Sequence, residues 1–113
     1  MTRGPGRRGA TALLAAAAVV GVGATCAPPR PQSHAVAIRS FTYRPETLTV
    51  AAGDTVVWTN GDVVPHTATA RDGGWDSGSL ATRQAWRFVA DTAGRYAYYC
   101  VFHPNMQGVV EVR

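Results

Sequence analysis

The sequence lacks several features that would each indicate a particular class of protein. After residue 33, no stretch shows helical periodicity longer than about one turn, which disfavours a helical domain. No internal repeat is evident, and no glycine-rich loop of the phosphate-cradling kind is present. The apolar run over residues 10–24 is too short to cross a bilayer, which needs about 20 residues. What remains is a small β-rich chain with an unusual N-terminal third.

The charge is unevenly distributed along the chain. The net charge is +4, but four arginines precede the predicted domain over residues 34–113. Within that domain seven basic side chains (Arg39, Arg44, Arg71, Arg83, Arg87, Arg95, Arg113) face seven acidic ones (Glu46, Asp54, Asp62, Asp72, Asp76, Asp91, Glu111). A neutral domain without a basic stripe lacks the charge that phosphate binding requires, so we expect no nucleic-acid partner.

Residues 1–33 are typical of an export leader followed by a Pro-rich linker. Arg3, Arg7 and Arg8 form a positively charged start, and the run of small apolar residues over 10–24 follows it. The Arg7-Arg8 pair could belong to a twin-arginine signal, but the residues that follow it match such a signal poorly, and the pair also fits the charged start of a general secretory signal. We therefore predict an exported protein, periplasmic or at the extracellular face of the cell membrane, with its export route left open.

The leader can end in one of two ways, at Cys26 or just before it. Segment 23–26 resembles a bacterial lipoprotein signal, in which the cysteine is acylated and becomes the mature N-terminus, although Thr25 is not the usual preceding residue. Alternatively, signal peptidase cuts after Ala24, because residues 22–24 form a small-residue cleavage site. The only membrane contact that we expect is a lipid anchor at Cys26.

Residues 34–113 form one predicted domain of short strands. Runs of alternating or β-branched residues are separated by turn signals such as Asn60-Gly61-Asp62. We expect strands over 35–41, 46–50, 55–60, 67–70, 84–89, 94–100 and 108–113. Strands of this length and spacing predict an all-β sandwich or barrel. Trp58, Trp75 and Trp86 are expected in its core or on a sheet face.

A thiol, an imidazole and a thioether follow one another at the spacing C-x-x-H-x-x-M. They are Cys100, His103 and Met106, which we expect in one loop between two strands. His66, after Pro65 at the start of another strand, can supply a second imidazole, because loops at one end of a sandwich meet in space. A thiolate, two imidazoles and a weak axial methionine are the ligands of a blue copper site. His34 is placed in the linker and has no expected role.

These residues resemble the cupredoxins over about 38–113. The short ligand loop is similar to that of amicyanins and shorter than that of plastocyanins; the segments 55–60, 65–67, 75–78 and 94–100 also match. The resemblance implies a Greek-key β-sandwich of about seven to eight strands and one type 1 copper ion, held by His66, Cys100, His103 and Met106. One residue departs from the pattern: Thr67 stands where family members often have an asparagine that ties the ligand loops together.

The resemblance also implies a function. Such a protein is not an enzyme but a monomeric carrier of single electrons, which cycles between Cu(II) and Cu(I) and docks briefly on redox partner proteins near His103. The residues expected around that histidine are Val63, Val64, Pro65, Phe102, Pro104 and Asn105.

The residue counts argue against several other copper and zinc functions. A dinuclear copper centre needs two bridging cysteines, and a multicopper oxidase needs many more than three histidines. No nucleophile and base pair remains once His66 and His103 bind metal. A structural zinc site is disfavoured because methionine is a poor zinc ligand. Storage or delivery of copper at the cell envelope remains the alternative to electron transfer.

Overall fold

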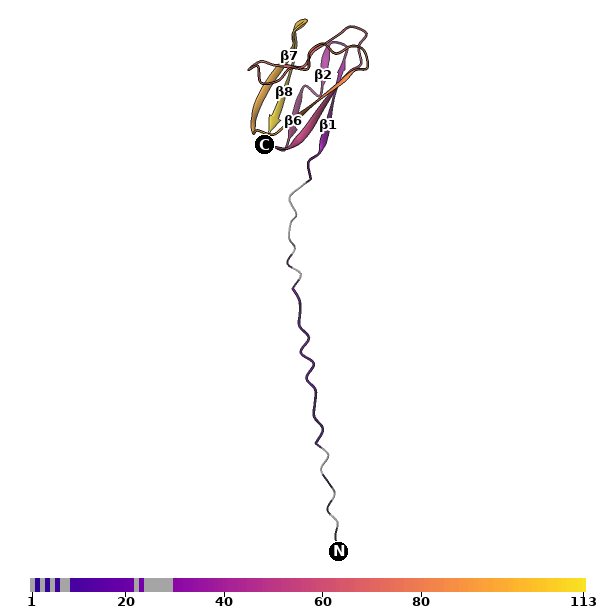
Figure 1. The fold of residues 1–113 in the computed structure, drawn as a ribbon, viewed down its shortest axis with the longest axis vertical. Helices are drawn as coiled ribbons and strands as arrows, with labels where there is room; N and C mark the ends of the chain where they lie inside the picture. Colours follow the sequence, from indigo (N-terminus) through magenta and orange to yellow (C-terminus); the bar gives the residue numbers. More distant parts are fainter. Residues whose placement is uncertain (1, 3, 5, 7–8, 22, 24–29) are drawn as a thin grey trace.

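Strand β4 (Asp54–Asn60) shows how the chain encodes a layered β fold. Val56, Trp58 and Asn60 are buried, while the side chains between them are more exposed. This alternation places one face of the strand against a core and the other toward solvent. The computed structural model describes residues 2, 4, 6, 9–21, 23 and 30–113, and residues 33–112 form two packed sheets (Figure 1).

The first sheet has the order β2-β1-β4-β6, and the second has the order β3-β8-β7-β5. The bounds are β1 Ser33–Arg39, β2 Thr42–Arg44, β3 Thr47–Val50, β5 Thr69–Ala70, β6 Ala85–Ala90, β7 Gly94–Cys100 and β8 His103–Val112. Strands β1 and β4 pair in parallel, as do β3 and β8, and the remaining pairs are antiparallel. The expected all-β sandwich is therefore confirmed.

Aromatic side chains fill the space between the sheets. Trp58 is fully buried, with its ring centroid 5.1 Å from that of Trp75 and 5.6 Å from that of Trp86. Tyr98 packs edge-on against Trp58, and Tyr43 packs against Tyr98 with centroids 4.5 Å apart. All three tryptophans thus lie in the core or against it, as expected. This rigid aromatic layer supports the ends of β4 and β7, from which the candidate site is built.

Several predicted strand boundaries were wrong, the short strand β2 was not predicted, and two of the differences concern histidines. Strand β1 begins at Ser33, so His34 lies in a strand and not in the linker; its Nε2 is 2.9 Å from Asp54 Oδ2. Strand β8 begins at His103 and not at residue 108, because Cys100 pairs with His103 across a turn of two residues. His103 and Met106 are thus strand residues, and only Val101 and Phe102 form the turn. The pairing of β7 with β8 continues up to this turn, so the segment over 103–107, which the ligand spacing indicated as a loop, belongs to a strand.

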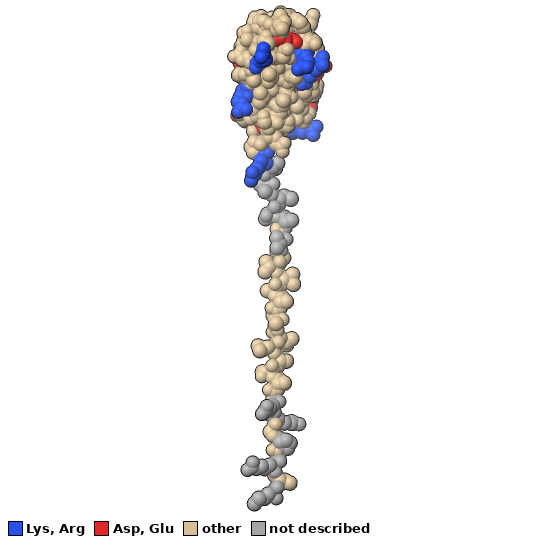
Figure 2. Space-filling model, turned by 90° about the vertical axis from the view of Figure 1, so that its right-hand side faces the viewer, with Lys and Arg blue, Asp and Glu red and all other residues tan. Residues whose placement is uncertain are grey.

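The predictions on Arg7-Arg8, on cleavage after Ala24 and on acylation of Cys26 lie outside the described residues. In the ranges that the structure describes, no helix is long and apolar enough to cross a membrane. Figure 2 shows one face of the domain, on which arginine side chains are scattered and do not form a stripe.

Candidate metal centre

Three of the four predicted ligands converge from two separate parts of the chain. His66 follows β4 and is fixed by a pair of backbone hydrogen bonds with Leu80. Cys100 ends β7, and His103 begins β8. One ligand atom from each of His66, Cys100 and His103 lies within 4.8 Å of the other two. Cys100 and His103 come 34 and 37 positions after His66 in the sequence, yet all three side chains share one site.

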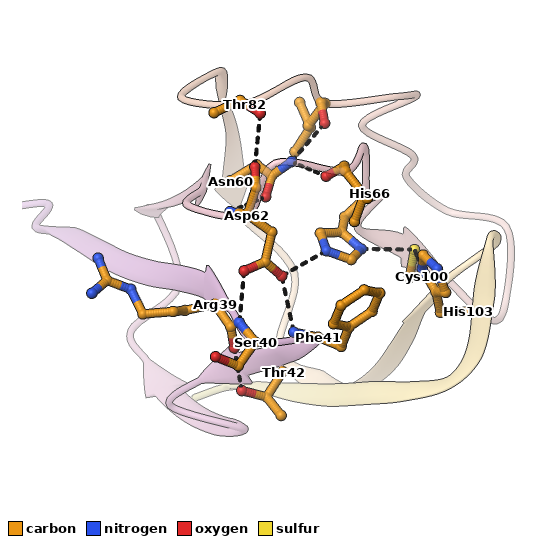
Figure 3. Close-up of polar contacts among 12 residues, drawn as sticks. Arg39, Ser40, Phe41, Thr42, Asn60, Asp62, His66, Thr82, Cys100 and His103 are labelled. Carbon is orange, nitrogen blue, oxygen red and sulfur yellow. Dashed lines mark hydrogen bonds and ion pairs between the residues drawn. The ribbon is translucent and has the colours of Figure 1, made fainter.

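The donor atoms of the three side chains face one another, as a copper site with a thiolate ligand requires. Cys100 Sγ is 3.8 Å from Nδ1 of His66 and 3.7 Å from Nδ1 of His103 (Figure 3). His66 and Cys100 are completely buried, whereas His103 is half-buried. Two imidazole nitrogens and one sulfur around a common point match the trigonal set of blue copper proteins. The donors present therefore fit one type 1 copper ion, the cofactor that the sequence predicted.

Met106, the fourth expected ligand, lies on β8 three residues beyond His103. It is 5 % exposed and belongs to the hydrophobic core. A buried thioether close to the strand start suits a weak axial ligand, and it also suits a core side chain.

Thr67 joins the two ligand segments in place of the asparagine that the family often has. Its backbone N–H donates to Cys100 Sγ at 3.3 Å, and its Oγ1 accepts from the Val101 N–H at 3.0 Å. Thr69 adds a hydrogen bond between hydroxyls, 2.9 Å long. The short threonine side chain suffices because pairing of β5 with β7 brings these backbones close together. The donor to sulfur is one of the levers that set the potential of such sites.

The second nitrogen of His66 contacts a residue that the sequence analysis did not assign to the site. His66 Nε2 lies 2.8 Å from Asp62 Oδ2. The same carboxylate accepts hydrogen bonds from the backbone N–H groups of Ser40, at 2.7 Å, and Phe41, at 2.9 Å. Burial acts to raise the pKa of Asp62, but these three hydrogen bonds together hold it below the usual value of an aspartate. The available signal was an aspartate four residues before the histidine.

Phe41 covers the site from the turn between β1 and β2. Its ring meets the rings of His66 and His103 edge-on, with centroids 5.1 and 4.9 Å away. Ser40 and Phe41 have φ angles of 53° and 60°, a region that residues other than glycine seldom adopt. The Asp62 carboxylate binds the N–H groups of both residues, so it stabilises this turn as well as the imidazole.

The loop that carries His66 is braced by a buried amide. Asn60 Nδ2 donates to the carbonyl oxygens of Val64 and Leu80, both at 2.9 Å, and Asn60 Oδ1 accepts from the Asp62 N–H. The hydroxyl of Tyr43 donates to the carbonyl oxygen of Thr67, directly after the ligand. Burial raises the pKa of Tyr43 and keeps this hydroxyl protonated. Polar side chains thus hold the backbone on both sides of His66, at Val64 and at Thr67.

Known proteins share this sequence pattern. The chain is 39% identical over 82 residues to amicyanin of Paracoccus versutus and 34% identical over 82 residues to that of Paracoccus denitrificans. It spans 62% and 63% of the lengths of these two relatives, respectively, and the matches cover 68% of the chain. Amicyanin-alpha of Methylorubrum extorquens is 31% identical over 108 residues, which are 91% of this chain and 87% of that protein.

Solved structures share the fold. An amicyanin variant in its oxidized state superposes with a TM-score of 0.67 at 31% identity, covering 72% of this chain and 82% of that one. A purple cupredoxin from Nitrosopumilus maritimus gives a TM-score of 0.67 at 32% identity, covering 71% of this chain and 99% of that one. The family model of the cupredoxin-like domain matches residues 10–112. With its two-sheet sandwich and its His-Cys-His cluster, the chain belongs to the cupredoxin family.

Proposed function

We propose that this protein carries single electrons between redox partner proteins through one type 1 copper ion held by His66, Cys100, His103 and Met106. The observation that carries the proposal is the convergence of two imidazole Nδ1 atoms on a buried thiol, within 4.8 Å of one another. Copper, when bound, supplies the Cu(II)/Cu(I) couple, and the protein supplies geometry and electrostatics. The proposal is of a carrier and not of an enzyme.

The chain's own residues support a site that changes little between oxidation states. His66 and Cys100 have no exposed surface, and each is tied to neighbouring backbone by hydrogen bonds. Fixed ligands need little rearrangement on gain or loss of an electron, which favours fast transfer. Asp62 forms a hydrogen bond with His66, and Thr67 accepts one from the N–H of Val101, directly after Cys100.

Electrons would enter and leave at His103, the half-buried member of the cluster. Two apolar side chains of the ligand segments are exposed: Phe102, next to His103 in the chain, is 50% exposed, and Val63, in the loop that carries His66, is 89% exposed. A small apolar surface suits brief docking to protein partners. We also propose that the protein acts as a monomer and has no nucleic-acid partner. Replacing Val64 or Pro104 by a charged residue should slow transfer and leave the blue colour. An unchanged transfer rate would refute this docking site.

Export completes the proposal. The leader over residues 1–33 would deliver the domain to the periplasm or to the extracellular face of the membrane, either released by cleavage after Ala24 or anchored through acylated Cys26. Mass spectrometry of the mature N-terminus decides between these forms: a diacylglyceryl mass on Cys26 supports the anchor, and an unmodified N-terminus at another residue rejects it.

The visible absorption spectrum tests the central proposal. Addition of Cu(II) to the purified protein should produce an intense band in the orange-red region, which the family resemblance leads us to expect from thiolate-to-copper charge transfer. Reductant should bleach this band, and Cys100→Ser should lack it. A colourless or pale product from the wild-type protein would show that the ligands do not bind copper together.

Storage or delivery of copper is the alternative function. Exchange kinetics separate the two, because a delivery protein should lose Cu(I) quickly to a competing chelator, whereas an electron carrier should keep it through many redox cycles. The complete burial of His66 and Cys100 favours retention of the ion.

A further inference from the structure

We propose that Asp62 is a positioning residue of the metal centre, which fixes the tautomer of His66, lowers the reduction potential of the site and holds the strained turn that places Phe41 over both histidine rings. This inference deepens the function proposed above and rests on it. It is carried by one carboxylate that contacts a ligand and a covering turn at the same time (Figure 3).

The tautomer follows from the hydrogen-bond partners. An ionised carboxylate only accepts hydrogen bonds, so His66 Nε2, 2.8 Å from Asp62 Oδ2, must carry the proton of a neutral ring. The lone pair is then on Nδ1, the atom that faces Cys100 Sγ at 3.8 Å. Asp62 therefore orients the correct nitrogen toward the metal position before any metal arrives, as carboxylates often do behind metal-binding histidines.

The charge of Asp62 acts on the redox couple through the same bond. A negative charge behind the imidazole increases the basicity of the ligand and favours the more positive metal state. Asp62 has its charge partly buried and bonded to uncharged donors at Ser40 and Phe41, so no cation among its hydrogen-bond partners cancels the effect. We therefore expect Asp62 to stabilise Cu(II) relative to Cu(I).

The turn depends on the same carboxylate. Ser40 and Phe41 are successive residues with positive φ angles, and neither is a glycine. Such a conformation persists only where surrounding groups impose it. Asp62 accepts one hydrogen bond from each of their N–H groups. Phe41, although 49% exposed, is thereby kept against the rings of His66 and His103.

The chain contains a matched control for this arrangement. Asp54 also accepts hydrogen bonds from one histidine Nε2, that of His34, and from two backbone N–H groups, those of Gln32 and Ala51. Asp54 starts β4, whereas Asn60, which braces the loop carrying His66, ends it; at about 3.3 Å per strand residue, the two ends are about 20 Å apart. Substitution of Asp54 should perturb packing to a similar extent without reaching the ligands.

The experiment compares Asp62→Asn, Asp62→Ala, Asp54→Asn and Asp54→Ala in the full chain. In copper-loaded protein, Asp62→Asn should change the ratio of Cu(I) to Cu(II) stability about tenfold toward Cu(I), a potential rise of about 59 mV for one electron. Both Asp54 variants should change it less than twofold. A shift of less than twofold in Asp62→Asn, or an equal shift in Asp54→Asn, would overturn the electrostatic role.

Nitrogen NMR of the metal-free protein tests the tautomer without copper. His66 should carry its proton on Nε2 in the wild type and in Asp62→Asn, whose side-chain oxygen can still accept, whereas Asp62→Ala should populate the Nδ1–H form. A proton on Nδ1 of wild-type His66 would overturn the proposal even if no variant folds. If the wild-type protein shows no visible band with Cu(II), the proposed copper function is contradicted, but the NMR result on the His66 tautomer still holds.

Discussion

The side-chain oxygen of Thr67 accepts a hydrogen bond from the backbone N–H of Val101 at 3.0 Å. These residues follow the first histidine and the cysteine of the site, so one bond spans the two ligand segments. Removing the hydroxyl in Thr67→Val leaves the part-buried Val101 N–H without its partner, which should lower the free energy of unfolding by about 1–3 kcal/mol. Denaturant unfolding of the metal-free protein measures this loss.

Thr67→Ser is the control, because it keeps the hydroxyl, and its loss should be smaller than that of Thr67→Val. The copper band should survive in both variants, since the donor to Cys100 Sγ is the backbone N–H of residue 67. Equal stabilities of the two variants would show that the hydroxyl bond contributes little.

Met106→Leu separates the two roles of a buried thioether. Leucine has a similar volume, so the free energy of unfolding of the metal-free protein should change by less than about 1.5 kcal/mol. The reduction potential of the copper-loaded protein should rise, because a weak donor to Cu(II) is lost. Voltammetry measures the potential; an unchanged value would assign Met106 to the core alone.

Gly108 lies where its strand passes directly beneath a buried tyrosine. A Cβ atom at Gly108 would overlap the ring of Tyr98, which is 1% exposed and cannot move outward. Gly108→Ala should therefore lower the free energy of unfolding by about 1–3 kcal/mol. The denaturant midpoint measures the effect. In a Tyr98→Leu background the same substitution should cost less, and an undiminished cost would rule out this contact as the cause.

Acid should destabilise the domain partly through Asp54. Hydrogen bonds from the Gln32 N–H, from the facing His34 ring and from the Ala51 N–H hold the pKa of Asp54 below its usual value. A carboxyl with a lowered folded-state pKa contributes stability above its unfolded pKa of about 3.9, and this contribution is lost as the pH falls through the folded-state pKa.

Thermal unfolding of the metal-free protein measures this effect from about pH 6 to about pH 2, a range that brackets the ordinary pKa of aspartate. Stability should fall less with acid in Asp54→Asn than in the wild type. The variant should start from a lower stability at neutral pH. Some acid sensitivity should remain, because the pKa of Asp62 is also lowered. Identical pH slopes in the two proteins would contradict the assignment to Asp54.

Local sequence patterns were sufficient for most of the strands, though not for all of their boundaries, and for the ligand chemistry. The alternation in β4 is visible in residues 55–60 themselves, and the spacing of Cys100, His103 and Met106 brings three donor types within a single short segment. The family resemblance drawn from these motifs is confirmed by the match over residues 10–112. Strand alternation and ligand spacing depend on residues that are close together in the sequence, so they can be recognised without the tertiary structure.

The tertiary structure decided what surrounds the ligands. Asp62 reaches the N–H groups of Ser40 and Phe41, 22 and 21 residues earlier, and Thr67 reaches Val101, 34 residues later. Neither contact follows from a local pattern, because each depends on which strands pair and in which register. The sequence alone therefore determined which atoms can bind the metal, and only the fold determined which nitrogen of His66 faces it, since that choice depends on a carboxylate held by a distant turn.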